Sequence, residues 1–124
     1  MSSEKLYSAS DVVAKLSTEL PNWKLHDGQI MRTFKTHGFR VSLMIANAIG
    51  HLSEVAWHHP ELVVSFSEVT VKLYSHDVDG ITDRDFEMAH KIENIIAWQP
   101  RDDAGALTGI PEKSAKFAYL KQEE

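Results

Sequence analysis

The sequence predicts a single α+β domain: a four-stranded antiparallel sheet with three helices on one face, in the order α-β-β-α-β-β-α. Two observations predict this class. Strand patterns occur as two adjacent pairs, and helical patterns stand before, between and after those pairs. Adjacent strands joined by short turns pair antiparallel, and such a sheet can be covered on one side only. The length of 124 residues and the 43% hydrophobic content suit one domain with its own core.

The first third of the chain predicts a helix followed by a hairpin. Hydrophobic residues recur at helical spacing from Ser8 to Leu20, after polar residues that can cap a helix, and Pro21-Asn22 ends the pattern. Two short strands follow at 23–26 and 30–36. The Asp27-Gly28 pair between them indicates a tight hairpin, because such a turn needs positive φ.

The middle of the chain predicts a long helix and a second hairpin. From Phe39 to about Trp57 the hydrophobic residues form two neighbouring stripes, which indicates a helix buried over much of its circumference. Pro60 ends this helix, because the residue before a proline is pushed out of the α region. Strands are predicted at 62–66 and 69–74, with a turn at Ser67-Glu68 between them.

The last predicted helix begins at the capping box Thr82-Asp-Arg-Asp85 and continues to Ile96, after a polar loop at 76–80. Beyond it the hydrophobic pattern dissolves. We therefore expect one domain over residues 1–98 and, over residues 99–124, a C-terminal extension that is not a separate domain. The polar composition of the extension favours a loosely ordered tail, which alternatively covers a sheet edge, closes over a pocket or mediates assembly.

Composition excludes several classes of function. The absence of cysteine rules out a disulfide framework, a thiolate zinc site and a cysteine nucleophile. With 13 basic and 18 acidic residues the net charge is −5, which argues against nucleic acid as a partner. The N-terminus lacks the order of a signal peptide and no apolar run is long enough to span a membrane, so we expect a cytoplasmic protein without membrane association.

Five side chains near the ends of predicted elements are suited to proton transfer: His58, His59, His76, Glu54 and Asp85. Glu54 and His58 are four residues apart, so they share one helix face. Structural explanations compete: the helix dipole favours a histidine at a helix C-terminus, and the capping box alone accounts for Asp85. A metal site is not expected, because adjacent histidines do not easily bind one ion and no His-x-x-x-His pair is present in the group.

The spacing of these residues is more specific than the residues themselves. It runs Glu54, three residues, His58-His59-Pro60, five residues, Phe66, nine residues, His76, eight residues, Asp85. This order resembles the signature of the pterin-4a-carbinolamine dehydratases. The resemblance covers roughly residues 21–97 and includes Trp23, the strand Ile30–Phe34, the helix into His58-His59-Pro60, the stretch Val69–His76, and Gly80–Asp85.

The resemblance implies the fold predicted above and a lyase activity. Family members dehydrate 4a-hydroxytetrahydropterin to the quinonoid dihydropterin and so support the recycling of tetrahydrobiopterin, the cofactor of aromatic amino-acid hydroxylases. No metal and no organic cofactor takes part, since the pterin is the substrate. The chain departs from the family at Phe66, where tyrosine or tryptophan is frequent.

The resemblance also implies roles for individual residues. His58 and His76 become the acid–base pair, whose order stays open, and His59 positions the pterin. Glu54 would support His58, and Asp85 the His76 side of the pocket. The implied substrate contacts are His59, Pro60, Phe66 and Ser75.

The partners implied by the resemblance are a small pterin and a second copy of the chain, in a homodimer or homotetramer. An alternative function is a non-enzymatic dimerisation, assembly or transcriptional cofactor on the same fold. The sequence keeps all three histidines and both acids of the motif, which favours the enzyme.

Overall fold

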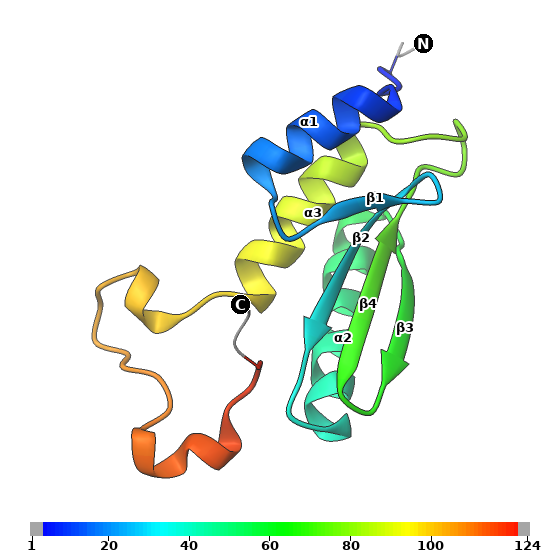
Figure 1. The fold of residues 1–124 in the computed structure, drawn as a ribbon. Helices are drawn as coiled ribbons and strands as arrows, with labels where there is room; N and C mark the ends of the chain where they lie inside the picture. The colour runs from blue at the N-terminus through cyan, green and yellow to red at the C-terminus, as the bar shows by residue number, and fades with distance from the viewer. Residues whose placement is uncertain (1–3, 122–124) are drawn as a thin grey trace.

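The computed structural model describes residues 4–121 and confirms the predicted order of elements (Figure 1). Short 3₁₀ helices follow in the C-terminal extension. The elements are α1 (Ala9–Glu19), β1 (Lys24–His26), β2 (Gln29–Lys35), α2 (Phe39–Ala56), β3 (Glu61–Ser65), β4 (Glu68–Leu73), α3 (Asp83–Ile96), η1 (Pro100–Asp102) and η2 (Glu112–Phe117).

The four strands form one antiparallel sheet in the order β1-β2-β4-β3, so the two central strands belong to different hairpins. The first hairpin turns at Asp27 and Gly28, with φ of 51° and 77°, as its turn type requires. In the second, β3 leaves Pro60 and reaches its turn after Ser65, and β4 returns antiparallel. This return places the end of β4 beside the start of β3, near the end of α2.

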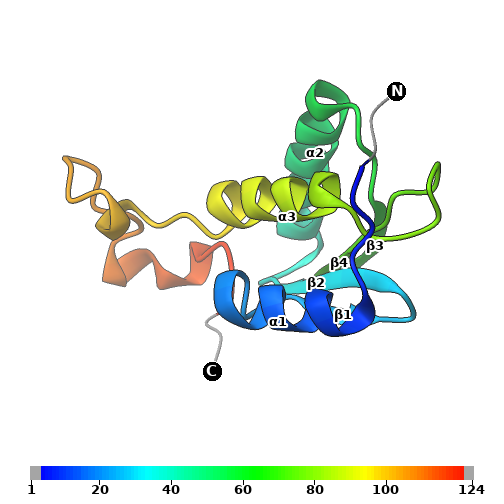
Figure 2. The same cartoon turned by 90° about the horizontal axis from the view of Figure 1, so that it is seen from above.

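The helices pack on one face of the sheet. Burial alternates along β2 and β4, so every second side chain enters the core. Viewed from above, α2 and α3 lie over the sheet and α1 runs along β1 (Figure 2). The core joins three groups of side chains: Val12 and Leu16 of α1 with Leu20 just after it; Ile30, Phe34, Val69, Val71 and Leu73 of the sheet; and Val41, Ile45, Ile49, Phe86, Ala89 and Ile92 of α2 and α3.

A buried ion pair ties the sheet to α3. Arg32 of β2 is 4% exposed, and its Nε and Nη2 donate to the Glu93 carboxylate over 2.8 and 3.1 Å. The indole Nε1 of Trp23 donates to the same carboxylate over 2.7 Å. A charged side chain in a strand core is therefore accommodated because α3 supplies its counter-charge.

The C-terminal extension returns to the body of the molecule. It loops away from α3 and then turns back (orange to red in Figure 1). Leu120 forms an isolated antiparallel bridge with Thr36, and the Lys121 N–H donates to the Lys35 carbonyl over 3.0 Å. Tyr119 and Leu120 pack against the core. The loosely ordered tail favoured by composition is thus replaced, within residues 99–121, by a segment that continues the sheet contacts beyond the end of β2.

Within residues 4–121, none of the helices is both long enough and apolar enough to cross a bilayer.

Candidate functional site

The chain reverses sharply between α2 and the first histidine. Helix α2 ends at Ala56, and Trp57 adopts the left-handed conformation with φ 54° and ψ 46°. The N–H groups of Trp57 and His58 both donate to the Ser53 carbonyl. A left-handed residue that closes the last turn in this way is the usual device for ending a helix, although glycine normally supplies it. The helix therefore ends within one residue of the predicted limit near Trp57, and the left-handed Trp57 ends it before Pro60 is reached.

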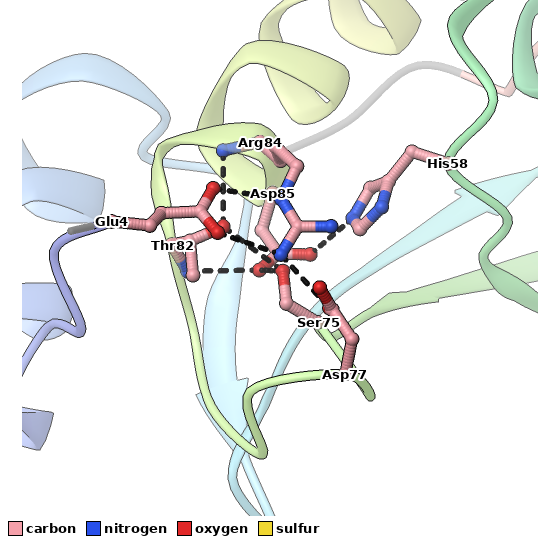
Figure 3. Close-up of polar contacts among 7 residues, drawn as sticks. All are labelled: Glu4, His58, Ser75, Asp77, Thr82, Arg84 and Asp85. Atoms are coloured by element: carbon pink, nitrogen blue, oxygen red, sulfur yellow. Dashed lines mark hydrogen bonds and ion pairs between the residues drawn. The ribbon is translucent and has the colours of Figure 1, made fainter. Parts of the chain in front are cut away.

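This reversal aims His58 at the first turn of α3. Its Nε2 lies 2.6 Å from Oδ1 of Asp85 (Figure 3). The imidazole is only 11% exposed, and the carboxylate is fully buried. A buried carboxylate fixes both the orientation and the tautomer of the ring that it contacts. With Nε2 engaged, Nδ1 is the ring nitrogen that can exchange a proton with a small molecule.

The second carboxylate oxygen of Asp85 is also hydrogen-bonded. Its Oδ2 accepts hydrogen bonds from the Ser75 hydroxyl over 2.7 Å and from the Thr82 N–H over 3.0 Å. The predicted capping box is confirmed, so Asp85 both caps α3 and anchors His58. Ser75 is 1% exposed and also lies 2.9 Å from the Thr82 hydroxyl. It supports the carboxylate, and the substrate contact that the resemblance implied for it stays a prediction.

His59 belongs to a second pair. Its Nε2 lies 2.6 Å from Oε2 of Glu54, and both side chains are open to solvent. The Trp57 ring packs edge-on against the imidazole, with 4.9 Å between ring centroids. Glu54 was expected to support His58. An unbroken helix would place those two residues on one face, but the left-handed turn at Trp57 brings His59 back over α2 and sends His58 toward α3.

His76 lies in the loop between β4 and α3. It follows Ser75, is exposed, and packs edge-on against the Tyr74 ring at 4.8 Å. It lines a pocket of about 410 Å³ with Tyr7, Gly80 and Ile81. Asp85, expected to support His76, contacts His58 instead and reaches the His76 backbone only through Ser75.

A separate pocket of about 260 Å³ lies beside His58, so the two histidines line different hollows in one chain. Four positions of α3 form its wall: Arg84, Glu87, Met88 and Lys91; Ala56 and His58 complete it. Sequence reasoning missed these four residues. Their spacing along the chain does place them on one face of the helix. A helix face with several polar residues usually indicates only contact with solvent, so the spacing alone did not predict a pocket.

Pro60 and Phe66 stand at opposite ends of β3. Pro60 is half-buried beside the histidines. Phe66 lies in the β3–β4 turn and is 72% exposed. The six residue steps from Pro60 to Phe66, through β3, separate the two by roughly 20 Å at the usual rise of a strand. Phe66 therefore lies away from His58 and His76 of its own chain, and its expected contact with the substrate stays a prediction.

No group of three or more histidine, cysteine, aspartate or glutamate side chains in the described part of the chain is arranged to hold a metal ion. The polar groups at the site are instead paired with one another, one carboxylate to each of His58 and His59.

Fold and geometry together define a class: a small α+β protein whose site is built on carboxylate-oriented histidines suited to proton transfer. Comparison with known proteins narrows the class. A family model described as "Pterin 4 alpha carbinolamine dehydratase" matches residues 5–95. The chain belongs to this family.

Individual relatives agree with the family match. A protein of Aquifex aeolicus named "Putative pterin-4-alpha-carbinolamine dehydratase" is 38% identical over 93 residues, which cover 68% of this chain and 94% of the relative. A protein of the same name from Thermosynechococcus vestitus is 39% identical, covering 71% and 92%. A solved structure from Brucella melitensis, described as "transcriptional coactivator/pterin dehydratase", has a TM-score of 0.66 at 28% identity and covers 73% of this chain and 98% of that one.

Proposed function

We propose that the chain dehydrates 4a-hydroxytetrahydropterin to the quinonoid dihydropterin by histidine acid–base catalysis, in support of tetrahydrobiopterin recycling. Family membership supports the dehydratase class. The observation that carries the catalytic part is the His58–Asp85 pair, an imidazole held at 2.6 Å by a fully buried carboxylate. Such a ring is fixed in place yet keeps one nitrogen for the substrate.

The reaction needs two proton transfers. The C4a–O bond breaks, and the departing oxygen takes a proton so that it leaves as water. The proton on N5 is removed as the C4a–N5 double bond forms, so one proton is given and one is taken. Groups with pKa values near the working pH can perform both transfers. General acid–base catalysis of this kind typically accelerates a reaction by about 10²–10⁴-fold. The scheme uses no metal ion and no organic cofactor.

His58 acts in this scheme through Nδ1, and His76 is its acid–base partner. His58 contacts the Asp85 carboxylate directly, and His76 follows Ser75, whose hydroxyl donates to the same carboxylate. His59, fixed by Glu54, positions the pterin. Pro60 sets the chain direction beside both neighbouring histidines and is a further substrate contact.

The chain acts as a homodimer or homotetramer in this proposal. Strand β3 lies at the edge of the sheet, and an edge strand offers unpaired backbone groups to a second copy. Phe66 is highly exposed at the end of that edge. It reaches a pterin only from a neighbouring copy, which keeps its proposed role compatible with the geometry of one chain.

A second candidate function is a transcriptional or assembly cofactor without catalysis. It is favoured by one observation, the description of the Brucella melitensis relative as a coactivator. The two candidates differ in whether the histidines matter: a cofactor acting through its surface keeps its role when His58 is replaced, whereas the enzyme loses its activity.

The test is the decay of chemically generated 4a-hydroxytetrahydropterin, followed by absorbance with and without the protein. We expect acceleration at micromolar protein. His58→Ala and His76→Ala should each lower the rate by about 10²-fold or more, the scale of general acid–base catalysis. His51→Ala is the matched control, because His51 is an exposed histidine of α2 outside the site.

Wild-type protein that leaves the decay unchanged would exclude the dehydratase. If the wild type is active and both variants match His51→Ala, the reaction is right and the assignment of the histidines is wrong.

A further inference from the structure

The N-terminal arm, residues 4–7, lies against the end of the loop that carries His76 and the start of α3. The Tyr7 N–H donates to the Ile81 carbonyl over 2.9 Å, and its phenol donates to the Asp83 carboxylate. Leu6 covers Gly80 so closely that a Cβ added there would come within 2.8 Å of the leucine. The arm therefore contacts the end of the loop at Gly80 and the residues that lead into α3.

Arg84 joins this arm to the loop and to the pocket of His58. Its Nε and Nη2 donate to the two oxygens of Glu4 over 2.7 and 2.8 Å, and Nη2 also donates to Asp77 over 2.9 Å (Figure 3). Arg84 is one wall of the His58 pocket, and Asp77 is the residue after His76. One planar guanidinium therefore spans the arm, the loop and the pocket wall, an arrangement that a lysine cannot reproduce.

The electrostatics of Asp77 agree with this geometry. Its hydrogen bond from Arg84 holds the pKa of the carboxyl below its usual range, and the charge of His58 lowers it weakly as well.

We propose that Glu4, Arg84 and Asp77 form a clamp that sets the position of His76 relative to His58. The three are positioning residues for the reaction proposed above, on which this inference rests. The ion pairs are partly open to solvent, with 37% of the Arg84 side chain and 65% of Asp77 exposed. Exposed pairs contribute little to stability, so their removal affects geometry more than folding.

The test compares Glu4→Gln, Asp77→Asn and Arg84→Lys with Glu68→Gln. Glu68 forms a similar exposed pair with Lys35 at the other end of the sheet, 3.6 Å apart, and serves as the control. We expect each clamp variant to lower kcat about tenfold with little change in KM, because small misplacements of catalytic groups are costly. The melting temperature should stay close to that of Glu68→Gln.

Amide hydrogen exchange over residues 76–80 gives a readout that does not depend on activity. Exchange should be faster in the three clamp variants than in the wild type and in Glu68→Gln. If the wild type shows no dehydratase activity, the proposed function fails, and the exchange data still decide whether the clamp orders the loop.

Two results would overturn the clamp. Unchanged exchange in Glu4→Gln and Asp77→Asn would show that the loop is ordered without it. A raised KM in Arg84→Lys alone, with Glu4→Gln and Asp77→Asn active as the wild type, would show instead that Arg84 contacts the substrate directly.

Discussion

Asp85 serves a backbone role and a proposed chemical role with the same carboxylate. One oxygen receives the N–H that begins α3, and the other receives the imidazole of His58. Because the capping box orients the carboxylate, the start of the helix also orients the histidine. A buried polar group with every partner satisfied is rigid, which is what a proton-transfer group requires.

Trp57 determines which carboxylate meets which histidine. The sequence identifies the two histidines and the two carboxylates of these pairs, but it pairs Glu54 with His58 because an ideal helix would do so. A tryptophan in the left-handed region is not expected from its residue type, since that conformation is unfavourable for a side chain with a Cβ. No pattern in the sequence reveals it, and this is why the pairs were predicted wrongly.

The conformation of Trp57 leads to a stability prediction. Trp57→Gly should raise the free energy of unfolding by about 1 kcal/mol, because glycine adopts the left-handed conformation without the steric cost. Urea unfolding of the variant beside the wild type measures it. A loss of similar size would contradict this and show that the contact of the indole with His59 outweighs the backbone strain.

At the scale of elements, the hairpins and helices were predictable because their signals are local. Asp27-Gly28 specifies the first turn, and Thr82 with Asp85 specifies the start of α3. The position of Phe66 shows the limit. Phe66 is only six residues from Pro60 along the chain. Strand β3 lies between them, however, and because it is extended the two residues are at opposite ends of the strand.

The Arg32–Glu93 pair joins elements that are distant in sequence and carries the second stability prediction. Glu93→Ala should destabilise the fold by about 3–5 kcal/mol, because it leaves Arg32 buried without this counter-charge and removes the acceptor of the Trp23 indole. Glu19→Ala, on an exposed pair with Lys15, should change the stability little. Equal losses in the two variants, measured by urea unfolding, would contradict the account of the buried pair.

At the scale of the whole molecule, the family match covers residues 5–95, and the chain continues beyond it to residue 124. The two relatives described above are covered over 94% and 92% of their length, whereas 68% and 71% of this chain is covered. That the extension folds back to Thr36 could not be read from its sequence, because one bridge and two half-buried side chains leave no periodic pattern.

A chain ending at residue 98 should fold and keep the proposed activity, since the histidines and their carboxylates all lie before that point. It should lose about 1–3 kcal/mol of stability, the scale expected when Tyr119 and Leu120 no longer cover the core. Circular dichroism, urea unfolding and the dehydration assay measure the three quantities. An unfolded product would contradict the division into a domain and an extension.

The central claim is that a buried carboxylate prepares His58 for proton transfer, and kcat of Asp85→Asn for 4a-hydroxytetrahydropterin tests it most directly. The amide keeps the shape of the side chain but removes the charge that supports the imidazole. We predict a fall in kcat of about 10²–10⁴-fold, the scale of general acid–base catalysis. Ser8→Ala, which removes the cap of α1, should keep the wild-type kcat while it loses stability by about 1 kcal/mol. An Asp85→Asn protein that is folded and as active as Ser8→Ala would contradict the claim.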